Sequence, residues 1–137
     1  MTPTARLFLA VALGASLGSV ARYLVSVAML DLLGPGFAWG TLTVNVLGSL
    51  LIGLYATLTE PDGRLMASPA TRHFVLTGFC GGFTTFSIFS LETLLLVERG
   101  DHLLAGLNIG ISAGLWLVAV WVGYRVGVHL NRLKGAN

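Results

Sequence analysis

Residues 78–90 read GFCGGFTTFSIFS and lie inside an apolar run that extends from about residue 74 to residue 97. Three glycines and four hydroxyl side chains in this stretch disfavour a continuous helix. A broken helix frees carbonyl and amide groups that lipid cannot satisfy, so the break must face protein, an ion or water. Freed carbonyls bind cations, and the N-terminus of a half-helix attracts anions. The stretch therefore predicts a polar site or, more simply, a glycine-rich packing contact.

The composition of the whole chain is that of a membrane protein. Of its 137 residues, 55% are hydrophobic and only 10% are charged, whereas a soluble domain carries about 25% charged residues. Its mean hydropathy is +0.83, and so short a chain has no large core in which to bury these side chains. At roughly 20 apolar residues per span, the length predicts an all-α membrane protein with four transmembrane helices in a single domain, residues 1–137.

The apolar runs predict where these helices lie. We expect spans at about residues 7–30, 39–58, 74–97 and 103–126, with the third helix broken in the middle of the membrane. Gly34-Pro35-Gly36 marks the loop after the first span, and Asp31 is expected in that loop rather than in the helix.

Basic residues are distributed unevenly between the two sides that four spans define. The side with both termini would hold six of them: Arg6, Arg64, Arg72, Arg125, Arg132 and Lys134. The opposite side would hold Arg99, together with Arg22 if its side chain reaches that interface. The positive-inside rule therefore predicts a multi-pass protein of the cell's inner (plasma) membrane with both termini in the cytoplasm.

Polar residues follow one face of the second expected helix. Thr41, Asn45, Gly48 and Ser49 recur at spacings of three and four, so they share a face. The simpler interpretation is a helix–helix hydrogen bond through Asn45. The functional interpretation is a polar group that lines a solute path.

The fourth expected helix separates polar and small residues onto two faces. Asn108 and Ser112 are four residues apart and share one face, whereas Gly106, Gly110 and Gly114 form a small-residue ladder. At about 100° per residue, the ladder lies nearly opposite the polar stripe. Helix packing explains the ladder but not the stripe, so Asn108 and Ser112 are candidates for a polar path.

Single aromatic and charged residues add further candidates. Phe86 and Phe89 are three residues apart, and their ring edges could hold a small dehydrated anion, although such rings are normally core. Arg22 either reaches the interface as an anchor or raises the potential of a vestibule. Glu92 could bond hydroxyls, titrate as a proton site or face water. Trp116 is expected to anchor its helix at the membrane interface.

Several classes of function are excluded. A single cysteine, Cys80, rules out an internal disulfide, and the three scattered histidines do not suggest a metal cluster. A formal net charge of +2 is too small to indicate nucleic-acid binding. No nucleophile–base pair stands out, so we expect no enzymatic activity.

Three stretches together resemble the CrcB/Fluc family of fluoride channels across essentially the whole chain. They are GASLGSVARY at residues 14–23, GTLTVNVLG at residues 40–48, and the third run from residue 78 to residue 92. The resemblance implies a channel that exports fluoride passively down its electrochemical gradient and so protects the cell from fluoride toxicity. It also implies an antiparallel, dual-topology dimer with two separate pores.

The resemblance also implies which residues form the fluoride pore. The expected pore combines ring edges with hydrogen-bond donors: Phe86, Phe89, Asn45, Ser112, Thr85, Ser87 and Asn108. Phe86 and Phe89 match the phenylalanines whose ring edges contact fluoride, and Asn45 and Ser112 match polar residues of the pore.

Two further pairs of residues match family positions outside the pore itself. The backbone carbonyls of Gly81 and Thr84 match those that hold a central structural sodium ion (Na+) at the dimer interface. Arg22 and Glu92 resemble the charged residues of the vestibule.

The chain departs from the family in two respects. Many members carry a tyrosine where this chain has Asn108, which could substitute as a donor. The uneven basic residues disfavour insertion in both orientations, which an antiparallel homodimer requires. We expect a homodimer, and a heterodimer with a paralogue is the alternative.

Two other functions fit a four-helix chain. A small multidrug-resistance-type exporter exchanges protons for cationic compounds through a membrane carboxylate, and only Glu92 could serve here. A scaffold protein would use its glycines for packing alone, so Phe86→Ile and Asn45→Asp would leave its function intact.

Overall fold

The computed structural model describes residues 2–134, which contain helices and no strand. In chain order the helices are α1 (Pro3–Leu33), α2 (Trp39–Leu58), α3 (Pro69–His73), the π-helix η1 (Phe74–Cys80), α4 (Gly81–Phe83), α5 (Ser87–Glu98) and α6 (His102–Lys134). Four helical stretches are long and apolar enough to cross a membrane, and the third of them combines α3, η1, α4 and α5 as Pro69–Glu98. The prediction of an all-α protein with four such stretches is confirmed.

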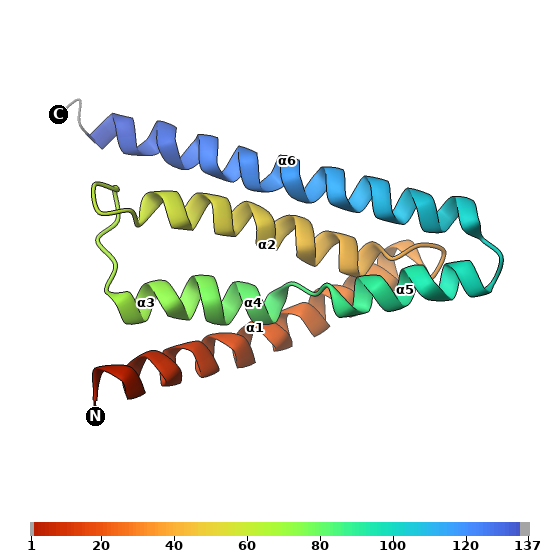
Figure 1. The fold of residues 1–137 in the computed structure, drawn as a ribbon, viewed down its shortest axis with the longest axis horizontal. Helices are drawn as coiled ribbons and strands as arrows, with labels where there is room; N and C mark the ends of the chain where they lie inside the picture. The colour runs from red at the N-terminus through yellow and green to blue at the C-terminus, as the bar shows by residue number, and fades with distance from the viewer. Residues whose placement is uncertain (1, 135–137) are drawn as a thin grey trace.

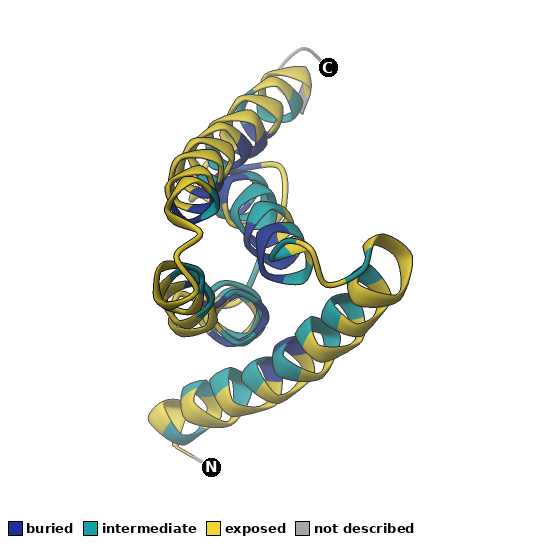
Figure 2. Ribbon diagram, turned by 90° about the vertical axis from the view of Figure 1, so that its right-hand side faces the viewer, coloured by how far each residue is buried: buried dark blue, intermediate teal, exposed yellow. Residues whose placement is uncertain are grey.

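The four stretches alternate in direction along the chain (Figure 1). α1 and the stretch from α3 to α5 run one way, whereas α2 and α6 run the other way, so α1 begins at the end of the bundle where α6 finishes. The outer faces of the helices are largely exposed in this single chain (Figure 2). Large apolar side chains on them, such as Phe8 and Leu117, are 73% and 70% exposed. Such a surface suits lipid or a partner chain rather than water.

Glycines let α1 pack directly on the backbone of the third stretch. Gly14 and Gly18 are the buried residues of α1. A side chain at Gly18 would collide with the carbonyl oxygen of Phe79, and one at Gly82 would collide with the backbone of Ala15. This close approach fixes the position of η1 and α4 against α1.

A hydrogen-bonded amide joins α6 to α2 near the end of the bundle where the chain begins. The Oδ1 atom of Asn131 accepts from the backbone N–H of Arg64 at 2.8 Å, and its Nδ2 donates to the carbonyl of Thr57 at 2.9 Å. Nearby, a side chain at Gly123 would collide with the carbonyl of Leu50, so α2 and α6 are also in backbone contact.

α1 and α6 extend beyond the apolar runs that predicted them. Thr2 caps α1, because its Oγ1 accepts from the N–H of Ala5 at 3.2 Å, and the helix continues to Leu33. Asp31 therefore lies in the last turn of α1, and its expected place in the loop is wrong. Gly34 ends the helix with a φ of 73°, a conformation that favours glycine.

We expect Gly18→Ala to destabilise the fold by about 1–3 kcal/mol, because the new Cβ would collide with backbone atoms of Phe79 and Phe83. Gly36→Ala is the control, since no atom of the described chain lies within 4 Å of a Cβ at that position. Thermal unfolding in detergent, followed by circular dichroism, compares the two variants. Equal unfolding midpoints would contradict the prediction.

Candidate functional site

The third helical stretch is interrupted at residues 84–86, between α4 and α5. Thr84 has an extended backbone, with φ −84° and ψ 161°. Its N–H still donates to the carbonyl of Cys80 at 2.9 Å, and its hydroxyl donates to the same oxygen at 2.8 Å. Thr84 is therefore the last residue that is hydrogen-bonded to the first half of the stretch, and the helix restarts as α5 at Ser87.

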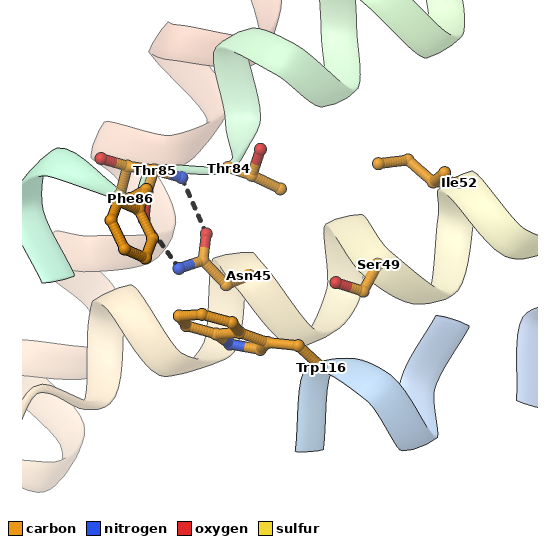
Figure 3. A pocket seen from close by; sticks show the side chains of 7 residues that line it. All are labelled: Asn45, Ser49, Ile52, Thr84, Thr85, Phe86 and Trp116. Carbon is orange, nitrogen blue, oxygen red and sulfur yellow. Dashed lines mark hydrogen bonds between the residues drawn. The ribbon is translucent and has the colours of Figure 1, made fainter. Parts of the chain in front are cut away.

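Asn45 of α2 supplies the hydrogen bonds that the interruption removes (Figure 3). Its Oδ1 accepts from the N–H of Thr85 at 2.7 Å, and its Nδ2 donates to the carbonyl of Thr85 at 2.8 Å. Both residues are buried, with exposed fractions of 5% and 8%. A buried polar group without a partner costs about 1–3 kcal/mol, so this one side chain stabilises the interruption and fixes it against α2.

The interruption also releases carbonyl oxygens from helical bonding, among them those of Gly81 and Thr84. In a continuous helix, the N–H groups of Thr85 and Ile88 would donate to the carbonyls of Gly81 and Thr84. Here the N–H of Thr85 donates to Asn45 instead, and that of Ile88 donates to Thr85 Oγ1 at 3.2 Å. The carbonyls of Gly81 and Thr84 are therefore available to other partners.

Arg22 and Glu92 both bond inward, to groups near the interruption. Arg22 Nη1 donates to the carbonyl of Thr84 at 3.3 Å. Glu92 Oε1 accepts from the hydroxyl of Thr41 at 2.9 Å, whereas its Oε2 is buried without a hydrogen-bond partner in residues 2–134. Glu92 also borders two cavities, of about 330 and 260 Å³. The structure thus ties Arg22 to the interruption itself, and Glu92 to a hydroxyl on α2.

Phe86 and Phe89 lie together at the start of α5, with ring centroids 5.6 Å apart and planes inclined by 46°. Their surroundings differ, because Phe86 is 71% exposed and Phe89 only 8%. Phe89 also packs edge-to-face on Trp116 of α6, with centroids 4.9 Å apart. Phe86 therefore presents its ring outside the single chain, whereas Phe89 is held within it.

An open cavity of about 220 Å³ lies beside the interruption (Figure 3). Its walls come from α2, from the interruption and from α6, and consist of Asn45, Ser49, Ile52, Thr84, Thr85, Phe86 and Trp116. The hydroxyl of Ser87 lies 3.2 Å from that of Thr85, so one further hydroxyl of the sequence cluster lies next to a residue of the cavity wall.

The structure corrects the expectation for Trp116. Instead of acting as an interfacial anchor, it lines the cavity and packs on Phe89. Its indole Nε1 is buried without a hydrogen-bond partner in the described part of the chain. Residue type alone suggested the anchor. The sequence does contain a signal against an interfacial anchor: Trp116 is four residues from Ser112, so it lies on the same face of α6 as the polar stripe.

Asn108 and Ser112 lie between α5 and α6 rather than in the cavity wall. Each is 1% exposed, and neither lines the cavity beside Asn45. Asn108 Nδ2 donates to Thr93 Oγ1 at 2.9 Å, and the hydroxyl of Ser112 donates to Asn108 Oδ1 at 3.4 Å. The two predicted pore residues therefore belong to a buried hydrogen-bond chain.

Four apolar helical stretches, with a cavity beside an interrupted helix, define an α-helical, multi-pass membrane protein. The family model described as "CrcB-like protein, Camphor Resistance (CrcB)" matches residues 9–124. The chain therefore belongs to the CrcB family, which confirms the resemblance of its three sequence stretches.

Relatives with curated names cover nearly the whole chain. Fluoride-specific ion channel FluC 1 of Rhodopseudomonas palustris (strain BisB18) is 56% identical over 131 residues, which make up 96% of this chain and 93% of the relative. Fluoride-specific ion channel FluC of Opitutus terrae is 53% identical over 130 residues, 95% of this chain and 98% of the relative. Both relatives are named as channels rather than as enzymes.

Proposed function

We propose that this chain forms a fluoride-selective channel in the inner membrane of the cell. Fluoride would leave passively, down its electrochemical gradient, and the cell would be protected from fluoride toxicity. Relatives that share 53–56% identity carry the name of such a channel. The observation that carries the proposal is the cavity at the interruption, where Asn45, Thr85 and Phe86 meet.

The chemistry of these groups suits a small anion. Fluoride is strongly hydrated, so donors must compensate for the water that it loses. The hydroxyls of Thr85 and Ser87 lie 3.2 Å apart at the start of α5, where the helix dipole favours negative charge. The edges of Phe86 and Phe89 carry positive quadrupole density. Chloride is larger and would fit poorly between these groups.

We propose that a second, antiparallel copy completes the path. Phe86 is 71% exposed in the single chain, as a ring that faces a partner would be. No atom of the described chain lies within 4 Å of a Cβ at Gly106, Gly110 or Gly114, so the glycine ladder of α6 is open to another helix. We favour a homodimer over a heterodimer with a paralogue.

We propose that the carbonyls of Gly81 and Thr84 hold a sodium ion between the two copies. Both are released from helical bonding, and Gly81 is exposed with open space around it, which fits a hard cation with oxygen ligands. The Thr84 carbonyl keeps a second lone pair beside the one that accepts from Arg22. When bound, the ion would supply fixed positive charge next to the interruption.

Reconstituted protein is expected to release fluoride from liposomes, as measured with a fluoride electrode, when valinomycin and a potassium gradient carry the compensating charge. Efflux should stop when valinomycin is omitted, because passive movement of one anion builds up an opposing potential. A proton-coupled exporter would instead respond to a proton gradient and move a cationic dye.

Efflux from a single gene product would support the homodimer. Folded protein that conducts only after co-expression with a paralogue would support the heterodimer. Folded protein that fails in both cases would overturn the proposed function.

A further inference from the structure

α6 presents a stripe of three residues, Asn108, Ser112 and Trp116, to α5 at successive four-residue spacings. The two helices are antiparallel neighbours, joined by a short turn (Figure 1). At one end of the stripe Asn108 bonds Thr93, and at the other end Trp116 packs on the ring of Phe89. The stripe therefore contacts the half-helix that carries both phenylalanines.

The polar atoms of Asn108 are engaged within the protein. Its Nδ2 donates to Thr93 Oγ1 at 2.9 Å, and its Oδ1 accepts from the hydroxyl of Ser112 at 3.4 Å. The side chain is 1% exposed and does not line the cavity beside Asn45. A residue in this position is better placed to hold α5 than to coordinate an ion in the cavity.

The directions of these hydrogen bonds form one continuous chain that ends at Phe89. The hydroxyl of Thr93 has a single proton, which it donates to the carbonyl of Phe89 at 2.8 Å. Toward Asn108, Thr93 Oγ1 therefore acts as the acceptor, and it accepts from Asn108 Nδ2. Asn108 Oδ1 in turn accepts from the hydroxyl of Ser112. Chains of this kind polarise one another and strengthen each bond.

We propose that Asn108 is a positioning residue that sets the rotation of α5, and with it the ring of Phe89, through Thr93. This inference rests on the proposed fluoride channel. The side chains of a helix extend about 5–6 Å from its axis, so a rotation of about 10° moves a ring edge by about 1 Å. Three contacts hold this half-helix against the bundle: the bond from Thr41 to Glu92, the packing of Phe89 on Trp116, and the bond from Asn108 to Thr93. The last of these acts directly on the turn that carries Phe89.

A double-mutant cycle on fluoride efflux tests the proposal. We expect Asn108→Ala and Thr93→Val each to slow efflux about fivefold. This factor corresponds to the free energy that is lost with one neutral hydrogen bond. The double variant should be no slower than either single variant, because both remove the same link. Chloride efflux should rise in all three, since a displaced ring discriminates less between the two anions.

Matched variants separate positioning from a general loss of structure. Asn108→Leu keeps the branched shape of the side chain without a donor and should behave like Asn108→Ala. Thr93→Ser keeps the hydroxyl and should conduct like the wild type. Thr57→Val removes a similar buried hydroxyl, which donates to the carbonyl of Gly53 at 2.8 Å on α2, and should leave the ratio of fluoride to chloride efflux unchanged.

Two results would overturn the proposal while the wild type still conducts. One is a double variant whose loss is the product of the single losses, which would indicate that Asn108 contacts the ion independently of Thr93. The other is an unchanged efflux rate and selectivity in Thr93→Val. Absence of efflux in the folded wild type would instead contradict the channel itself.

Discussion

Asn45→Asp is expected to slow fluoride efflux by about a hundredfold in reconstituted protein that still folds. The amide of Asn45 satisfies both backbone groups of Thr85, at 2.7 and 2.8 Å. A carboxylate can still accept from the N–H, but it places an anionic oxygen against the Thr85 carbonyl and adds negative charge beside the cavity. The loss of a buried hydrogen bond together with this repulsion amounts to about 3 kcal/mol, or about two orders of magnitude in rate.

Asn131→Asp is the matched control for this change. Asn131 also accepts from one backbone N–H and donates to one carbonyl, at 2.8 and 2.9 Å, but near the end of the bundle where the chain begins. It should reduce stability and leave the efflux rate per folded protein within about twofold of the wild type. If both variants slowed efflux equally, the effect would be one of folding and the assignment of Asn45 to the pore would fail.

Phe86→Ile is expected to slow fluoride efflux about tenfold, the upper range of what one aromatic edge contributes. Isoleucine keeps an apolar side chain but has no ring edge to present to an anion. Because Phe86 is 71% exposed in the single chain, the change removes little packing within that chain. Fluoride efflux, measured with the fluoride electrode, and chain association, measured by gel filtration, would be determined on the same samples.

Phe8→Ile provides the corresponding control, since Phe8 is 73% exposed on α1 and lies outside the site. It should conduct like the wild type. A scaffold protein would show no difference between the two variants, and that result would contradict a role of Phe86 in conduction.

The four helical stretches could be predicted because membrane helices need long apolar runs, and those runs are visible in the sequence. The helix ends could not, because a membrane helix can continue past its apolar run into polar residues. Asp31 illustrates this, since charge suggested a loop where α1 still has its last turn. The π-helix η1 between His73 and Gly81 also left no periodic signal that distinguishes it from an α-helix.

For the site, polar residues in apolar runs pointed to the interruption and the cavity beside it, but not to their hydrogen-bond partners. Asn45 was a candidate from its position alone, and its two bonds to Thr85 appear only when α2 and the interruption meet. Trp116 was assigned by residue type, whereas tertiary packing places it against Phe89. Spacing could not tell which glycines of α6 pack within the chain, as Gly123 does, and which remain open, as Gly110 does.

The glycine contacts between α1 and the third stretch also constrain how the length of this protein can change. Inserting one residue into α1 between Arg6 and Val11 would leave the backbone contacts of Val11, Gly14 and Gly18 intact and rotate only the residues before the insertion, by about 100°. The same insertion between Gly14 and Gly18 would turn one glycine away and bring a bulkier side chain onto the carbonyls of Phe74 or Phe79. Viable insertions and deletions in a library should therefore concentrate in the loops at residues 34–38, 59–68 and 99–101, and spare the residues around both glycines.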